Sequence, residues 1–92
     1  MKSIIQSKRE CYLCKSQQQL EVHHLLQGPN RNQAEKQGLK VYLCRSCHYT
    51  VHNMNYQELN KLHILGQKKF EETHTREEFM ALFHKNYIME EE

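Results

Sequence analysis

The chain has 92 residues, a net charge of +2 and a low apolar fraction of 38%. A core in a domain this small contributes only about 3–5 kcal/mol of net stability. No stretch approaches the roughly 20 apolar residues of a membrane span, which excludes a transmembrane protein. Four cysteines and seven histidines instead predict a single domain stapled by a metal or by disulfides.

The basic residues gather in the first half of the chain. Residues 1–52 contain eight Lys or Arg and three Glu, a net of +5, whereas residues 53–92 contain five and eight, a net of −3. This asymmetry favours a polyanionic partner on the basic side, and a mixed-charge surface is the alternative. The apolar pair Ile4-Ile5 is too short for a signal-peptide core. We therefore expect an intracellular, cytoplasmic protein, in which reduced thiols favour metal ligation over disulfides.

The first half predicts two strands, separated by a loop and flanked by Cys-x-x-Cys turns. Residues 20–26 are rich in strand formers and end at the turn signal Gly28-Pro29. The polar stretch that continues to Gly38 is expected to be a loop. Residues 39–43 alternate apolar and polar side chains, which is the period of a half-buried strand.

The second half reads as helical. A helix is expected to begin with residues 48–52, and a second covers residues 56–74, although Gly66 argues against its continuity. Thr75–Glu78 fits a capping box at the start of a third helix. Apolar residues at helical spacing follow it and predict a packed core face: Phe79, Leu82, Phe83 and Tyr87.

The two Cys-x-x-Cys pairs are the strongest signal in the sequence. Each pair lets two thiolates from one turn reach the same ion, and two such turns complete a tetrahedron of sulfurs about 2.3 Å from Zn²⁺. A redox Cys-x-x-Cys motif would need a thioredoxin-like βαβ setting, which the neighbouring sequence does not offer. We therefore predict a structural zinc ion bound by Cys11, Cys14, Cys44 and Cys47.

A rival ligand set takes Cys11 and Cys14 together with His48 and His52, as in a zinc finger. The 33 residues between Cys14 and His48 far exceed the roughly 12 to 15 of such fingers. This set would also leave the second cysteine pair unused, so it is the weaker prediction.

Four histidines fall near these elements. His48 and His52 are spaced i, i+4, so both imidazoles lie on one helix face and can reach one ion. His23 and His24 would point to opposite faces of a regular strand, so both serve one site only if the strand ends or bends there. The zinc would bring this strand and helix together, placing three or four imidazoles in one place. Incidental surface histidines are the alternative.

From Leu20-Glu-Val-His-His24 to Cys44-Arg-Ser-Cys-His-Tyr-Thr-Val-His52, the chain resembles the HNH (His-Me finger) nucleases. The resemblance covers roughly residues 11–52. The segment Gln27–Arg31, with Gly38-Leu39 beyond it, is similar to small phage-borne members. The resemblance to HNH nucleases implies an α+β fold in one domain, with an N-terminal extension (1–10), a zinc-stapled ββα-metal core (11–52) and a C-terminal helical extension (53–92).

The resemblance also implies roles for the histidines. His24 would be the general base, and three ligands would hold a catalytic divalent ion: His23, His48 and His52. In this family the ion is Mg²⁺, Mn²⁺, Ni²⁺ or Zn²⁺, and three imidazoles suit the transition metals better than Mg²⁺. The chain departs from the family at Leu39, where an Asn usually braces the loop that carries the base. Asn30 and Asn32 are the candidates to replace it.

The expected function is metal-dependent endonuclease cleavage of nucleic acid, with double-stranded DNA as the substrate and low sequence specificity. Four basic residues are expected to contact phosphates, with solubility as the alternative role: Arg31, Lys36, Lys40 and Arg45. A phage-encoded enzyme would act in the host cytoplasm. The competing interpretations are a non-catalytic zinc module that binds nucleic acid or protein, and a redox or metal-storage protein. The sequence leaves open DNA versus RNA, nicking versus double-strand cleavage, and the oligomeric state.

Overall fold

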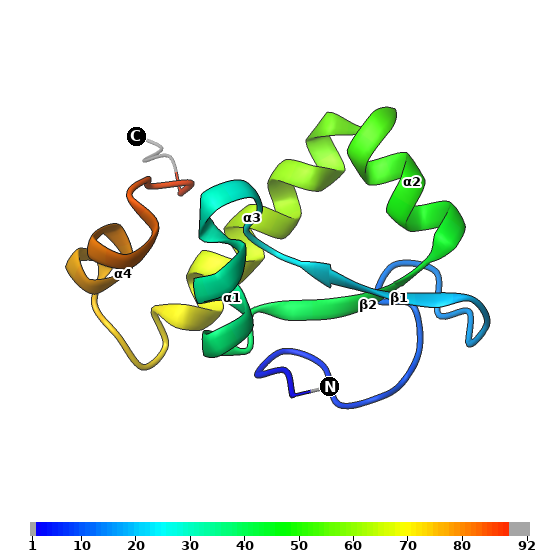
Figure 1. Cartoon of the computed structure of the whole chain (residues 1–92), viewed down its shortest axis with the longest axis horizontal. Helices are drawn as coiled ribbons and strands as arrows, with labels where there is room; N and C mark the ends of the chain where they lie inside the picture. The colour runs from blue at the N-terminus through cyan, green and yellow to red at the C-terminus, as the bar shows by residue number, and fades with distance from the viewer. Residues whose placement is uncertain (1, 89–92) are drawn as a thin grey trace.

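Two short antiparallel strands form the centre of the fold in the computed structural model, which describes residues 2–88. Strand β1 (Leu20–His24) pairs with β2 (Lys40–Cys44), so that His23 lies opposite Val41 and His24 lies opposite Lys40. The described chain adds a short 3-10 turn, η1 (Gly28–Asn30), and four α-helices: α1 (Arg31–Gln37), α2 (Arg45–Asn53), α3 (Tyr56–Phe70) and α4 (Arg76–Phe83). Figure 1 shows α2 on one side of the strands and the N-terminal segment on the other. The predicted α+β class is confirmed.

Residues 31–37 form helix α1, so the prediction of a loop there was wrong. The helix is short and buries only Ala34, which leaves no apolar periodicity for sequence analysis to detect. Gly38 ends it in the left-handed conformation (φ 73°), and its N–H donates to the carbonyls of Ala34 and Glu35. A Cβ at this position would lie 3.2 Å from the side chain of Ile4. Glycine is therefore required by both the conformation and the close packing.

The alternation of apolar and polar residues predicted a half-buried strand here. Instead, strand β2 is largely buried. The N-terminal segment runs along the free edge of β2. Tyr12 N–H donates to the carbonyl of Tyr42 at 2.8 Å, Tyr42 N–H donates to Gln6 Oε1 at 2.7 Å, and Ser3 Oγ donates to the carbonyl of Lys40 at 2.6 Å. Residues 3–12 therefore belong to the folded core rather than to a loose extension.

Helix α2 begins earlier than predicted, whereas helix α3 begins at Tyr56 as predicted and ends earlier. Helix α2 begins at Arg45, inside the second Cys-x-x-Cys turn. Helix α3 runs without a break through Gly66 and ends at Phe70, short of His74. A Cβ on Gly66 would lie 3.0 Å from Cβ of Leu25, so the glycine reflects close packing against the residues that follow β1.

Helix α4 begins as predicted and closes an aromatic core. Thr75 Oγ1 accepts from the backbone N–H of Glu78, and the Glu78 carboxylate accepts from the backbone N–H of Thr75, which confirms the capping box. The helix ends at Phe83, so Tyr87 packs against the core from beyond the helix rather than from within it. The rings of Phe70, Phe79 and Phe83 lie with centroids 4.7–5.9 Å apart. Residues 89–92 of the predicted C-terminal extension lie outside the described residues.

Among residues 2–88, no helix combines the length and the apolar character needed to cross a lipid bilayer.

We predict that Phe79→Ala lowers the free energy of unfolding by about 3–5 kcal/mol, because it leaves a cavity among fully buried rings. Urea unfolding of the zinc-loaded protein measures this. Met80→Ala is the control, since its side chain is 39% exposed on the same helix and its loss changes stability by only about 0.5 kcal/mol. Equal losses for both variants would show that α4 does not dock on the core.

Candidate metal centres

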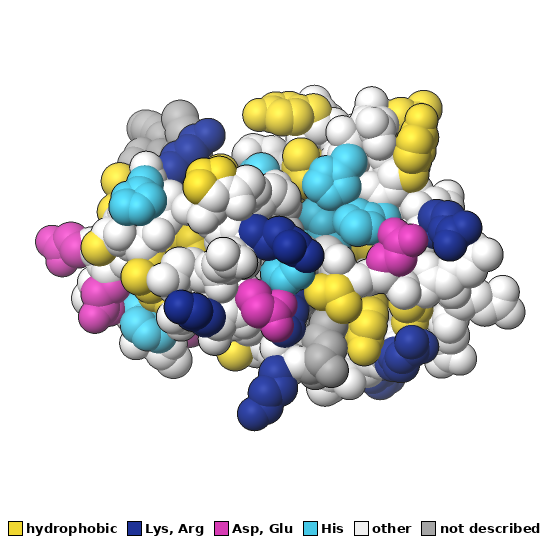
Figure 2. All heavy atoms as spheres, viewed as in Figure 1, with side chains coloured by type: hydrophobic (Ala, Val, Ile, Leu, Met, Phe, Trp, Pro, Cys, Tyr) yellow, Lys and Arg dark blue, Asp and Glu magenta, His cyan; other side chains and the backbone are white. Residues whose placement is uncertain are grey.

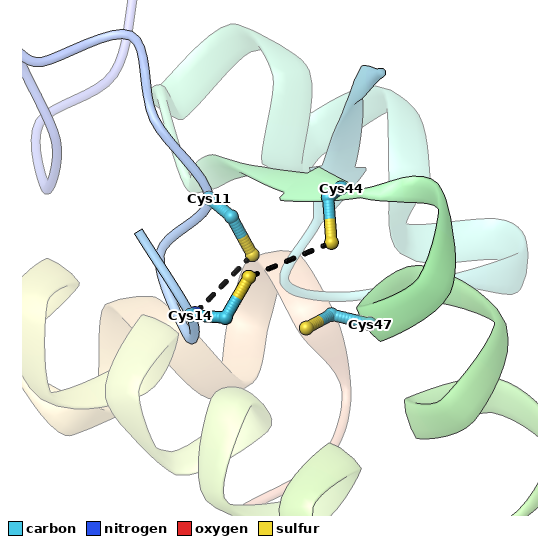
Figure 3. Close-up of side chains that lie close together, drawn as sticks. All are labelled: Cys11, Cys14, Cys44 and Cys47. Carbon is cyan, nitrogen blue, oxygen red and sulfur yellow. Dashed lines mark hydrogen bonds between the residues drawn. The ribbon is translucent and has the colours of Figure 1, made fainter. Parts of the chain in front are cut away.

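The four cysteine sulfurs lie within 4.8 Å of one another. Figure 3 shows that Cys11 and Cys14 come from the loop before β1, Cys44 from the end of β2, and Cys47 from the first turn of α2. Cys14 Sγ lies 3.7 Å from Cys44 Sγ, and Cys11 Sγ accepts from the backbone N–H of Cys14 at 3.4 Å. All four are free of disulfides. The group could hold a structural metal such as zinc.

The surroundings of these thiols shift the pKa values of Cys11 and Cys47 in opposite directions. Burial raises the pKa of Cys11, but backbone N–H donors outweigh burial and bring it to about 6. Burial, followed by the neighbouring thiols, raises the pKa of Cys47. Four thiolates in so small a group repel one another unless a cation is bound. The donor set therefore fits a divalent ion that favours sulfur, as zinc does.

We predict that Cys44→Ser unfolds the domain and removes one equivalent of zinc, because structural zinc contributes about 10 kcal/mol or more to folding in finger peptides. Thermal melting and elemental analysis of the purified protein measure both effects. Ser46→Ala, at an exposed neighbouring position, should change neither. Unchanged melting of the Cys44 variant would rule out a zinc staple.

Three of the predicted histidines form a second cluster. One ring nitrogen from each of His23, His48 and His52 lies within 4.8 Å of the other two. The ring centroids are 5.0–5.2 Å apart. His48 and His52 thus gather with His23 rather than with the first cysteine pair, which argues against the zinc-finger ligand set.

His23 is the buried member of this cluster, and its ring carries an unpaired atom. It is 1% exposed, and its Nε2 atom has no hydrogen-bond partner within the described chain. Burial, followed by the nearby rings of His48 and His52, lowers the pKa of His23 to about 3, so the imidazole is neutral at pH 7. A buried polar atom without a partner is costly. A bound cation would use that lone pair and remove the cost.

A carboxylate orients a second member of the cluster. Glu21 Oε1 accepts from Nδ1 of His48 at 2.8 Å, which leaves Nε2 of His48 for an ion. The hydrogen bond from His48 lowers the pKa of the Glu21 carboxyl. A carboxylate behind a histidine in this way fixes the ring and its tautomer at many metal sites. Glu21 precedes His23 by two residues on β1 and so lies on the same face, a spacing from which sequence analysis could have identified it.

The histidine cluster is open to solvent. A cleft of about 280 Å³ lies over it, lined by Glu21, Arg45, His48, Tyr49, His52 and Asn53. Figure 2 shows histidine side chains gathered on the surface beside an acidic and a basic side chain. A larger groove, of about 850 Å³, lies between the N-terminal segment, α1 and β2 and contains none of the clustered histidines. We place the candidate chemistry at the smaller cleft, because two members of the histidine cluster, His48 and His52, line it.

His24 is the last residue of β1 and does not belong to the cluster of His23, His48 and His52. Its ring turns to helix α1, where Nε2 lies 2.7 Å from Oε1 of Glu35. The second carboxylate oxygen of Glu35 accepts from Nζ of Lys40 at 2.5 Å. Hydrogen bonds from Lys40 and then from His24 lower the pKa of Glu35 to about 2. Sequence analysis missed Glu35 because it lies on the unpredicted helix.

The side chain that holds the backbone of His24 belongs to neither of the predicted asparagines. Asn30 donates to the carbonyl of Phe83 at 3.0 Å and so ties η1 to α4. Asn32 is exposed. Instead, Nε2 of Gln27 donates to the carbonyl of His24 at 2.5 Å, and its Oε1 lies 2.7 Å from Nε2 of His63 on α3. The structure thus anchors the backbone of His24 to α3.

The predicted phosphate contacts do not all lie on the surface. Arg31, Lys36 and Arg45 are exposed, and Arg45 Nε lies 3.5 Å from Glu21 beside the histidine cleft. Lys40 is only 5% exposed and pairs with Glu35. Lys40 is therefore poorly placed to contact phosphate, because its buried ammonium is already paired with the half-exposed Glu35 carboxylate.

No protein-family model, no curated protein and no solved structure matches the chain. The functional assignment therefore rests on the chain's own side chains and on the motif resemblance.

We predict that the protein binds a second divalent ion in addition to zinc, and that His52→Ala weakens this binding by at least the roughly 10- to 100-fold effect of losing an outer-shell partner. Equilibrium dialysis with Mn²⁺ or Ni²⁺ measures the affinity. Without added Mn²⁺ or Ni²⁺, zinc content and melting temperature should stay the same, because His52 is exposed and outside the cysteine group. A wild-type protein that binds one zinc and nothing further would favour a non-catalytic zinc module.

Proposed function

We propose that this chain is a metal-dependent endonuclease of the HNH type, with a ββα-metal core formed by β1, β2 and α2. The observation that carries the proposal is the gathering of His23, His48 and His52 around an unpaired buried nitrogen. Packing alone gives no reason for three imidazoles to meet at a solvent-filled cleft. The order of elements, with a cysteine turn before β1 and another at the β2–α2 junction, supports the same family.

His24 is the group we assign to proton removal. A neutral imidazole can take a proton from a water molecule as a general base. Nδ1 of His24 makes no hydrogen bond to any residue from 2 to 88 and is not among their buried unpaired atoms. The His24 side chain is 10% exposed, so this nitrogen is not fully buried and is the ring atom left to act as the acceptor.

The remaining groups would position the substrate. An ion held by His23, His48 and His52 would polarise the phosphate and stabilise the leaving oxygen. Arg45 and the exposed residues Arg31 and Lys36 would contact phosphates, which gives affinity without reading sequence. We propose double-stranded DNA as the substrate and an intracellular location, and the family resemblance suggests a 5′-phosphate product.

We predict that His24→Ala lowers the rate of plasmid nicking by about 10²- to 10⁴-fold, the range for loss of a general base. The assay uses supercoiled plasmid and a panel of Mg²⁺, Mn²⁺, Ni²⁺ and Zn²⁺, with a structured RNA tested in parallel. His74→Ala, at an exposed position on the turn after α3, is the matched control and should cut at the wild-type rate. An unreduced rate in the His24 variant, with zinc content intact, would remove His24 from the mechanism.

A further inference from the structure

We infer that Glu35 is a positioning residue that fixes the tautomer and the orientation of His24. This role rests on the proposed function, since it concerns the base of that reaction. The contact itself stands on geometry alone, with Nε2 of His24 and Oε1 of Glu35 2.7 Å apart. The HNH resemblance did not predict a carboxylate at this place.

The chemistry of the pair determines which nitrogen carries the proton. An ionised carboxylate only accepts hydrogen bonds, so Nε2 of His24 must be the donor. In a neutral imidazole the other nitrogen, Nδ1, then holds the lone pair. Because Nδ1 has no hydrogen-bond partner among residues 2–88 and is not fully buried, the carboxylate leaves the reactive lone pair on the unoccupied nitrogen of the ring.

Lys40 keeps Glu35 in the state that this role requires. The lysine is buried and lies directly across the β1–β2 pair from His24, so both side chains leave the same face of the strands. Its ammonium, with three donors and no acceptor, occupies the second carboxylate oxygen. The carboxylate therefore stays ionised and presents one fixed oxygen to the imidazole. Packing alone would not place a buried lysine against the same carboxylate that contacts a histidine.

The arrangement distinguishes a carboxylate from an amide of the same shape. In Glu35→Gln, Lys40 can face only the amide oxygen, which turns the NH₂ group toward His24. Nε2 of His24 would then have to accept, and the proton would move to Nδ1. The variant is therefore expected to hold His24 in the wrong tautomer with little change in shape.

The test measures the tautomer of His24 directly, by ¹⁵N chemical shifts of the ring in the full-length, zinc-loaded protein at about pH 8, where an ordinary imidazole is neutral. We expect the Nε2–H tautomer in the wild type and Nδ1–H in Glu35→Gln. For nicking, kcat should fall by about 10²- to 10⁴-fold with little change in KM, because the DNA contacts are retained. Glu77→Gln, at an exposed position on α4, is the control and should change neither measurement.

A second variant distinguishes a change of tautomer from simple unfolding of the Glu35→Gln protein. In Glu35→Gln combined with Lys40→Met, the amide is free to turn its oxygen back to His24. We expect the Nε2–H tautomer and part of kcat to return, because the amide oxygen can again accept from Nε2 of His24. A loss caused only by damaged packing would not be rescued by a second core change.

The two proposals fail in different ways. A His24 tautomer that is the same in the wild type and in Glu35→Gln would overturn the role of Glu35, whether or not the protein cuts DNA. A wild-type protein that cuts no nucleic acid, but whose tautomer follows residue 35 as described, would overturn the nuclease assignment and support the contact.

Discussion

The gathering of four cysteine sulfurs into one small group is the constraint on which the rest of the fold depends. It joins the loop before β1 to the junction of β2 and α2, which lies 30 residues away along the chain. Closing such a long loop costs entropy that a five-residue strand pair cannot offset by itself. Once the loop is closed, β1 and α2 lie side by side, and the histidines on both elements meet. The second cluster is therefore a geometric result of the first.

The sequence predicted the groups whose chemistry is strongest and whose spacing is regular. The Cys-x-x-Cys pairs predicted the sulfur cluster, and the i, i+4 spacing of His48 and His52 predicted a shared face. The capping box at Thr75 was visible because local hydrogen bonds determine it. What the sequence did not show depends on tertiary contacts. Helix α1 has a single buried anchor in Ala34, and Lys40 reads as a polar strand residue until the Glu35 carboxylate is placed beside it.

The three polar residues absent from the sequence prediction share one physical feature: each makes a hydrogen bond that holds a histidine in place. Glu21 holds the ring of His48, Glu35 holds the ring of His24, and Gln27 holds its backbone. No regular sequence spacing identifies such residues. Glu21 is the exception, because it shares a strand face with His23. Their positions follow from the fold, so they become visible only when α1 and the β1–α1 loop are in place.

Cys47 and His48 are neighbours on the same rigid helix, and His23 sits on the strand hydrogen-bonded to the one that ends at Cys44. An ion at the sulfur group would restrict the motion of α2 relative to β1 and so would also organise the imidazoles. Thermodynamic linkage would make such an effect reciprocal, so a cation bound by the imidazoles would tighten metal binding at the sulfur group by the same factor. In this small protein the two clusters would then act as one cooperative unit, in which loss of either ion lowers the affinity for the other.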